Sequence, residues 1–249
     1  MPFSLYLKSK SIAAEAAPTR TGSNYPMPDI LIADDHPLFR DALQRAVMVA
    51  VPTARVDTAD SVHTLLALIE QFPDAELLLL DLHMPGARGY SALAHIRGQY
   101  PGLPTIVVSG HEEASVARRA LAHGASAYIP KSTSSENIVL AIRAVLDGDI
   151  WLPHSMHDSP GELDPDEAVA AGQVASLTPQ QFRVMTMIAE GLLNKQIAYD
   201  LGVSEATVKA HMTAIMRKLQ VNNRTQVALI ASQLAVNQEA LPSLPEDGD

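Results

Sequence analysis

Short apolar runs alternate with stretches of helical period between residues 28 and 150. The apolar runs are rich in Val, Ile and Leu, as buried parallel strands are. Strands are therefore expected at 30–33, 55–59, 77–80, 105–108 and 127–129, and helices at 37–49, 61–72, 90–99, 114–123 and 134–147. Five strands alternating with five helices predict a doubly wound α/β domain with a five-stranded parallel sheet.

A second pattern begins near residue 176 and is helical almost throughout. Thr178-Pro179-Gln180-Gln181 has the form of a helix start, with a capping Thr, Pro at the first position and Gln three residues after the cap. Further helices are expected at 194–200, from Ser204 onward and at 225–234, and Gly202 makes the intervening turn. This spacing predicts a small all-α helix-turn-helix domain over residues 176–237.

Three segments show neither pattern. Residues 1–27 lack sustained periodicity and are expected to form an extended or disordered arm, although Met27 stands directly before the first strand and is a possible native start. Residues 151–175 hold five acids and no base, together with Pro and Gly, and are expected to be a solvated acidic linker. Residues 238–249 hold four acids and no base and are expected to be an acidic tail.

The formal net charge of −10 hides an uneven distribution. Residues 28–150 carry 9 Lys and Arg against 15 Asp and Glu, whereas residues 176–237 carry 6 against 3. The second domain is therefore locally basic, which suits a nucleic-acid partner. The chain has no apolar run of membrane-spanning length, no secretory signal and no cysteine, so a cytoplasmic protein without membrane contact is expected.

Polar residues follow four of the predicted strands. They are Asp34, Asp35, Asp81, Ser109 and Lys131. Because the carboxyl ends of parallel strands share one edge of the sheet, these side chains should gather in an acidic pocket. Crowded carboxylates favour a hard divalent cation such as Mg²⁺. We expect Asp35 and Asp81 to bind Mg²⁺ directly, Asp34 to bind it through water, and the backbone carbonyl of His83 to complete the protein ligands.

Such a pocket suits attack of a carboxylate on a phosphoryl group. Asp81 would become an acyl phosphate, and Lys131 would pair with the phosphoryl group as a point charge. The Ser109 hydroxyl could turn toward a phosphoryl oxygen, and the rotamer of Tyr128 could follow it. Six histidines show no convergent ligand set and are interpreted as surface or capping residues: His36, His63, His83, His95, His111 and His123.

The two aspartate motifs carry a family resemblance. Asp34-Asp35-His36-Pro37 and Asp81-Leu82-His83-Met84-Pro85-Gly86 make residues 28–150 resemble a CheY-like, flavodoxin-like receiver domain, and in particular that of the NarL/FixJ class of two-component response regulators. The resemblance implies phosphorylation of Asp81 by a sensor histidine kinase, dependence on Mg²⁺, and a switch through Ser109 and Tyr128. Each receiver position holds a permitted residue.

The second domain resembles the LuxR-type helix-turn-helix that ends the same regulator class. The matching words include Asn194-Lys195-Gln196-Ile197-Ala198, Val203-Ser204-Glu205-Ala206-Thr207-Val208-Lys209-Ala210-His211 and Arg217-Lys218-Leu219-Gln220-Val221-Asn222-Asn223-Arg224. One departure is Gln180-Gln181, where the family commonly has Arg-Glu. An acid that would pair with Arg217 or Lys218 is therefore absent, and domain packing is expected to be softer there.

The first turns of a recognition helix are the part that reaches base edges in the major groove. The candidate DNA-binding residues are Lys195, Ser204, Thr207, Val208, Lys209, His211, Arg217 and Lys218. One small domain with few phosphate contacts would bind weakly, so we expect a homodimer when the protein is phosphorylated. The candidate dimerisation residues are Val227, Leu229, Ile230 and Leu234, although the same side chains could instead complete the monomer core.

These observations support one hypothesis and leave two alternatives. The hypothesis is a transcription factor in which phosphorylation of Asp81 controls dimerisation and sequence-specific binding to double-stranded DNA. The first alternative is a phosphorylation-independent interaction module. The second is a metal-dependent phosphohydrolase with an Asp nucleophile, but Leu82-His83 offers no carboxylate at the two positions after Asp81 to activate water. The hypothesis therefore does not make the protein an enzyme.

Overall fold

The computed structural model describes residues 27–87, 89–153, 156 and 164–236. Within them a five-stranded parallel sheet has the strand order β2-β1-β3-β4-β5, which confirms the predicted α/β class. The strands are β1 (Asp29–Ala33), β2 (Arg55–Ala59), β3 (Leu77–Asp81), β4 (Thr105–Ser109) and β5 (Ala127–Pro130). The expected arm at 1–27, except for Met27, and the expected tail at 238–249 lie outside the described residues.

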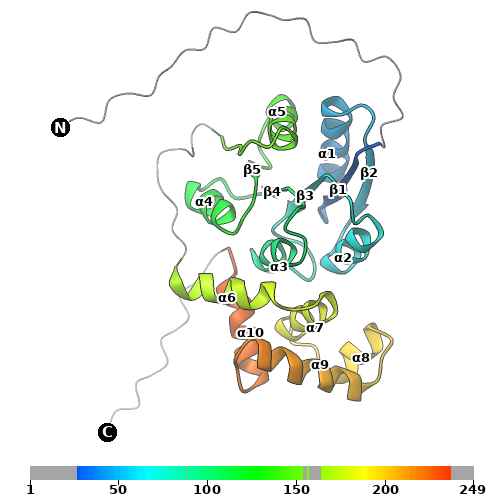
Figure 1. Cartoon of the computed structure of the whole chain (residues 1–249), viewed down its shortest axis with the longest axis vertical. Helices are drawn as coiled ribbons and strands as arrows, with labels where there is room; N and C mark the ends of the chain where they lie inside the picture. Colours follow the sequence, from blue (N-terminus) through cyan, green and yellow to red (C-terminus); the bar gives the residue numbers. More distant parts are fainter. Residues whose placement is uncertain (1–26, 88, 154–155, 157–163, 237–249) are drawn as a thin grey trace, which may run out of the picture.

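Helices cover both faces of the sheet (Figure 1). One face packs on α1 (Pro37–Ala50) and α5 (Ser135–Leu146), and the other on α2 (Val62–Gln71), α3 (Ser91–Gln99) and α4 (Ala114–Ala122). Successive strand residues point to opposite faces: Ile30 and Ile32 join the core with α1 and α5, whereas Leu31 joins the core of the opposite face. Burial on both faces explains the nearly continuous apolar runs of the strands.

The second domain is built from four helices. They are α7 (Pro179–Ala189), α8 (Asn194–Asp200), α9 (Glu205–Lys218) and α10 (Arg224–Gln233). The predicted capping box is confirmed at α7, where the Thr178 hydroxyl accepts from the Gln181 N–H and the Gln181 amide oxygen accepts from the Thr178 N–H. Gly202 adopts a φ of 63° between α8 and α9, a conformation that favours glycine. The helix-turn-helix prediction is therefore confirmed.

The segment predicted to be a solvated linker contains a helix, α6 (Pro165–Ala175), which corrects that prediction. Asp164 caps α6, and Pro165 occupies its first position. The acid-rich composition concealed a stripe at helical spacing, because Glu167, Ala170 and Val174 are all buried. One of the five acids is thus an internal residue and not part of a solvated surface.

The two domains are packed against each other through α6. Helix α3 contacts α6, α2 contacts α7, and one apolar core runs from the α2–α4 face of the sheet into α7–α10 (Figure 1). A hydrogen bond also crosses the boundary, where the Gly86 backbone N–H donates to a side-chain carboxylate oxygen of Glu190 at 3.1 Å. Among the described residues, no helix is both long and apolar enough to cross a bilayer.

Candidate phosphoacceptor pocket and nucleic-acid interface

The polar residues predicted to meet at one sheet edge do meet there. Asp34 follows β1, Asp81 ends β3, Ser109 ends β4 and Lys131 follows β5, and these four strands are neighbours in the sheet. Asp34, Asp81 and Ser109 are fully or almost fully buried, and Lys131 is one-fifth exposed. The parallel topology therefore places two buried carboxylates beside one cation.

Lys131 joins the two carboxylates. Its Nζ lies 2.8 Å from Asp34 Oδ2 and 2.9 Å from Asp81 Oδ2. Burial raises the pKa of Asp81, and the hydrogen bonds from Lys131 and from the His83 N–H oppose that effect. Burial alone would lower the pKa of Lys131, but its contacts with Asp34 and Asp81 outweigh burial and raise that pKa. Lys131 is consequently held as a cation inside the pocket.

The donor set fits a hard cation. Ligand atoms of Asp34, Asp35, His36 and Asp81 all lie within 4.8 Å of one another. Asp34 Oδ2 and Asp35 Oδ1 are buried and lack a hydrogen-bond partner of good geometry, although Lys131 and His36 lie at ion-pair distance from them. Buried oxygens of this kind are suitable Mg²⁺ ligands. The roles of Asp34, Asp35, Asp81 and the His83 carbonyl as ligands remain predictions.

His36 is a pocket residue that sequence reasoning set aside. Its Nδ1 lies 2.7 Å from Asp35 Oδ1 and 3.4 Å from Lys131 Nζ. The only sequence signal was its position directly after Asp34-Asp35, which is too common an arrangement to assign a role. The imidazole therefore orients Asp35 at the rim of the pocket.

Ser109 and Tyr128 both contact the segment that leaves β4. Ser109 Oγ accepts from the His111 N–H at 3.3 Å, and the Tyr128 hydroxyl donates to the His111 carbonyl at 2.8 Å. Burial raises the pKa of Tyr128 to about 12, so its phenol stays a hydrogen-bond donor at neutral pH. The two expected switch residues thus hold the same short stretch, residues 110–113, which leads into α4.

Two histidines are internal: His95 is neither a surface nor a capping residue, which corrects that interpretation, whereas His123 is a capping residue of α4, as predicted, but is buried. His95 on α3 is fully buried and stacks on Phe182 of α7, with ring centroids 4.2 Å apart and planes 3° from parallel. His123 is buried at the end of α4, where its Nε2 lies 2.7 Å from Glu167 Oε1. Both rings lie where the first domain meets elements that follow it, a contact that local sequence patterns do not signal.

The recognition helix α9 presents part of the predicted DNA-binding set. Thr207 and Lys209 are exposed near its start, Arg217 is exposed near its end, and Lys195 is exposed on α8. Val208 is wrong as a DNA contact, because its side chain is fully buried in the domain core. The helical period explains the error: Val208 faces Met212 and Ile215 on the inner side of α9, opposite the exposed positions.

The remaining candidates have structural contacts of their own. Ser204 caps α9 through its hydroxyl and the Thr207 N–H, at 3.1 Å. His211 is half-buried. Lys218 donates from Nζ to the Ser176 carbonyl at 2.7 Å. This hydrogen bond ties α9 to the start of the domain, although Gln180-Gln181 provides no acidic partner for Lys218. A role in DNA binding for Ser204, His211 and Lys218 stays a prediction.

The predicted dimerisation residues are mostly used within the monomer. Val227 and Leu234 are fully buried, Ile230 is half-buried, and Leu229 is 41% exposed. Helix α10 packs on α7 through this apolar side, while its end reaches the first domain. Val227 and Leu234 therefore correspond to the alternative in which these residues complete the monomer core, and Leu229 is the member best placed to meet a partner.

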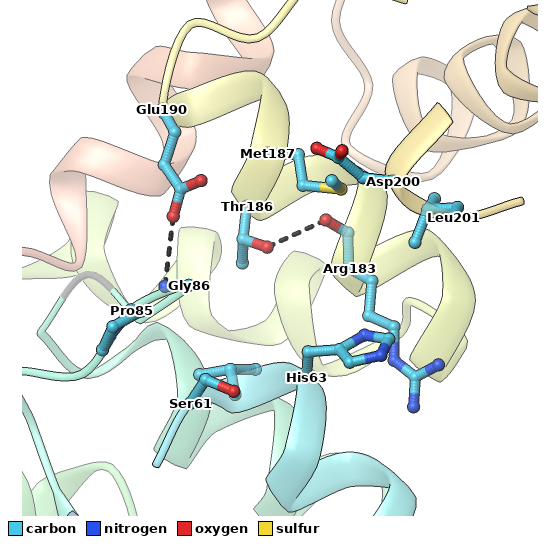
Figure 2. A pocket seen from close by; sticks show the side chains of 11 residues that line it. Ser61, His63, Pro85, Gly86, Arg183, Thr186, Met187, Glu190, Asp200 and Leu201 are labelled. Atoms are coloured by element: carbon cyan, nitrogen blue, oxygen red, sulfur yellow. Dashed lines mark hydrogen bonds between the residues drawn. The ribbon is translucent and has the colours of Figure 1, made fainter. Parts of the chain in front are cut away.

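A cleft of about 280 Å³, with a mainly apolar lining, marks the boundary between the domains. Figure 2 shows Ser61 and His63 on one side and residues of α7 and α8 on the other, with the Glu190 side chain reaching the Gly86 backbone. None of the residues that line the cleft belongs to the acidic pocket or to α9.

Comparisons with known proteins match both halves of the chain. Residues 30–143 match the response regulator receiver domain, and residues 175–231 match the luxR family of bacterial regulatory proteins. The chain is 38% identical over 210 residues to the glycerol metabolism activator of Pseudomonas putida, covering 82% of this chain and 95% of that protein. It is 31% identical over 214 residues to the nitrate/nitrite response regulator protein NarL of Escherichia coli strain K12, covering 85% and 98%.

A solved structure also covers both domains. RcsB from Salmonella enterica serovar Typhimurium, bound to promoter P1flhDC in the presence of phosphomimetic BeF3⁻, is 24% identical, with a TM-score of 0.48 over 84% of this chain and 100% of that chain. The matched relatives are named for regulation and not for an enzymatic activity.

Proposed function

This chain belongs to the two-component response regulators that join a receiver domain to a LuxR-type helix-turn-helix and regulate transcription, and on that premise we propose that phosphorylation of Asp81 controls its binding to DNA. The observation that carries the proposal is the ammonium of Lys131 held between Asp34 and Asp81 at the sheet edge. A cation in that position is ready to pair with a phosphoryl group on Asp81.

The chemistry is a transfer between two nucleophiles. A carboxylate oxygen of Asp81 attacks the phosphorus of a phosphohistidine in a sensor histidine kinase, the P–N bond breaks, and an aspartyl phosphate forms while the imidazole leaves. Lys131 neutralises part of the added charge, and Ser109 offers a hydroxyl to a phosphoryl oxygen. Because Asp81 is 1% exposed, the donor has to reach it from the open edge of the sheet.

Receiver domains in general bind Mg²⁺ at an acidic pocket, and here Asp34, Asp35, Asp81 and the His83 carbonyl are the proposed ligands. When bound, Mg²⁺ neutralises phosphoryl oxygens during transfer. The close grouping of the Asp34, Asp35 and Asp81 carboxylates supports this assignment, because their ligand atoms lie within 4.8 Å of one another, as shared coordination of one hard cation requires.

The output is proposed to be binding of a cytoplasmic homodimer to two half-sites on double-stranded DNA. Exposed Thr207 and Lys209 near the start of α9 support direct contact with the major groove, and Lys195 and Arg217 suit phosphate contacts. The domain's small positive excess, 6 basic against 3 acidic residues, gives a single copy little electrostatic affinity, which favours two copies acting together.

A phosphodonor experiment tests the acceptor. Wild-type protein incubated with a small-molecule phosphodonor and Mg²⁺ should acquire one acid-stable, hydroxylamine-sensitive phosphoryl group, detected by intact-protein mass. Asp81→Asn should acquire none, whereas Asp74→Asn, at an exposed carboxylate outside the pocket, should behave as wild type. Equal labelling of Asp81→Asn and wild type would show that another residue is the acceptor.

A further inference from the structure

The cleft between the two domains is lined by residues that belong to neither candidate site. The receiver contributes Ser61, Val62 and His63 at the start of α2 and the turn at Pro85-Gly86, and the other wall comes from α7 and the end of α8. Its volume of about 280 Å³ lies just below the range of about 300–1,000 Å³ that is typical of sites for drug-sized ligands. The cleft therefore suits a compact organic molecule.

The greater part of the lining is apolar. Val62 and Pro85 belong to the receiver wall, and Met187 and Leu201 belong to the opposite wall (Figure 2). Apolar walls supply most of the contact with a bound molecule, while a few placed polar groups fix its orientation. The body of a matching ligand is therefore apolar, and its polar group is set by the charged side chains at the cleft.

Arg183 of α7 lines the cleft without a partner for its charge. Its Nε is buried and has no hydrogen-bond partner, and among the described residues no carboxylate lies within ion-pair distance of its guanidinium. A buried donor without an acceptor is costly. A carboxylate is the acceptor that matches a guanidinium best, because it can accept two parallel N–H bonds. One wall of the cleft thus holds an unsatisfied cation.

His63 brings a second donor from the opposite wall. Figure 2 shows its imidazole and the Arg183 side chain converging on the cleft, one from the receiver and the other from the helix-turn-helix domain. His63 is exposed, and in the described part of the chain it also has no acid at ion-pair distance. The start of α2 adds the positive end of a helix dipole, which favours an anion.

The acids that line the cleft do not neutralise these donors. Glu190 accepts from the Gly86 N–H at 3.1 Å, and Asp200 is exposed at the end of α8. In Figure 2 both carboxylates lie on the side of the cleft away from the Arg183 guanidinium. The end of the cleft nearest to Arg183 and His63 is therefore suited to an anionic group.

From this combination we propose that the cleft is a binding site for a small monocarboxylate, held at its anionic end by Arg183 and His63 and along a compact apolar body by the remaining lining. The site lies outside the acidic pocket and acts independently of the proposed phosphorylation of Asp81. Because its two walls belong to different domains, a bound carboxylate stabilises the packing of α2 on α7 by mass action.

Benzoate is a suitable probe, because it joins one carboxylate to a rigid apolar ring of the required size. A ligand-observed NMR titration with the full-length wild-type chain should give saturable binding, with a dissociation constant of about 1 mM or below. Benzamide, which has the same shape without the charge, should bind about tenfold more weakly or worse. Benzylamine, which carries the opposite charge, should bind no better than benzamide.

Three variants locate the bound probe. Arg183→Met removes the guanidinium and keeps an unbranched side chain, so it should weaken benzoate binding about tenfold or more. His63→Ala, on the other wall, should weaken it about threefold through loss of one hydrogen bond of ordinary strength. Arg45→Met, at an exposed arginine of α1 on the opposite face of the sheet, should bind benzoate as wild type does.

Loss of affinity in both Arg183→Met and His63→Ala would support a carboxylate site between the domains. Loss in Arg183→Met alone would place the probe on α7 and overturn the bridging site. Unchanged affinity in both variants, no saturable binding of benzoate to wild type, or tighter binding of benzamide or benzylamine would also overturn the proposal. Because His63 is exposed, His63→Ala keeps the test decisive even where circular dichroism shows that Arg183→Met is unfolded.

Discussion

Lys131 illustrates how a single residue holds the pocket together. Its ammonium offsets two carboxylates, Asp34 and Asp81, that are 0% and 1% exposed. The sequence placed all three residues at strand ends, and their convergence was predictable because the ends of parallel strands such as β1, β3 and β5 share one edge of the sheet. The part played by His36 was not predictable, because its contacts with Asp35 and Lys131 depend on side-chain orientation and not on strand order.

Replacing Lys131 with methionine should destabilise the fold, because it leaves two buried carboxylates without their cation. We expect a loss of roughly 3 kcal/mol in the free energy of unfolding in Mg²⁺-free buffer. Added Mg²⁺ should raise the midpoint of the variant more than that of wild type, since the ion would occupy the same acidic site. Urea denaturation followed by circular dichroism measures both, and equal stability of variant and wild type would contradict the described pairing.

His95 should make stability depend on pH. Burial against Phe182 lowers the pKa of His95 to about 4, with the Val174 backbone opposing the effect and no charged group contributing. In the unfolded chain the pKa of His95 is near 6.5, so as the pH falls the unfolded chain takes up this proton before the folded chain does. Stability from this residue should be complete above about pH 6.5 and fall by up to about 3 kcal/mol toward pH 4.

The difference between wild type and His95→Phe isolates this contribution, because phenylalanine preserves the stacking and removes the titrating group. Unfolding free energies measured between pH 4 and 7.5 should converge as the pH rises and separate in favour of His95→Phe as it falls. Parallel curves would show that His95 is accessible to protons in the folded chain.

At the scale of elements, most helices and strands were predicted from the periodicity of hydrophobic residues and from capping residues. The five strands, the receiver helices and α7 to α10 all show a local signal, such as the Thr178–Gln181 capping box. Helix α6 was missed because its acids suggested solvation, although Glu167, Ala170 and Val174 have helical spacing. Composition averages over a segment, whereas burial depends on which side of a helix each residue occupies.

Substitutions on the buried and exposed sides of α9 should affect folding stability and DNA binding separately. Val208→Ala removes buried methyl groups and should cost about 2 kcal/mol of folding free energy. Lys209→Ala, at the exposed neighbouring position, should leave stability nearly unchanged but weaken binding and reduce the salt slope by about 1. Thermal unfolding and anisotropy titrations across salt concentrations measure these effects; a DNA-binding defect without destabilisation in Val208→Ala would put that residue at the interface instead.

At the scale of the whole molecule, the packing of the two domains could not be predicted from local sequence patterns. Arg119 and Glu167, whose side chains form hydrogen bonds between α4 and α6, are 48 residues apart, and nothing near either residue signals the other. The same holds for His95 and Phe182, which meet only when α3 and α7 are brought together. The motifs thus identified the two domains, whereas the contacts that pack one domain against the other required the three-dimensional structure.

We propose that phosphorylation at Asp81 governs how much DNA the protein occupies. The most direct measurement incubates full-length wild type and Asp81→Asn with sheared genomic DNA, with and without phosphodonor and Mg²⁺, and sequences the retained fragments. Phosphodonor should concentrate wild type on a defined set of sites and leave the Asp81→Asn profile unchanged. Identical enrichment of the two proteins by phosphodonor, or no enrichment of wild type, would contradict the claim.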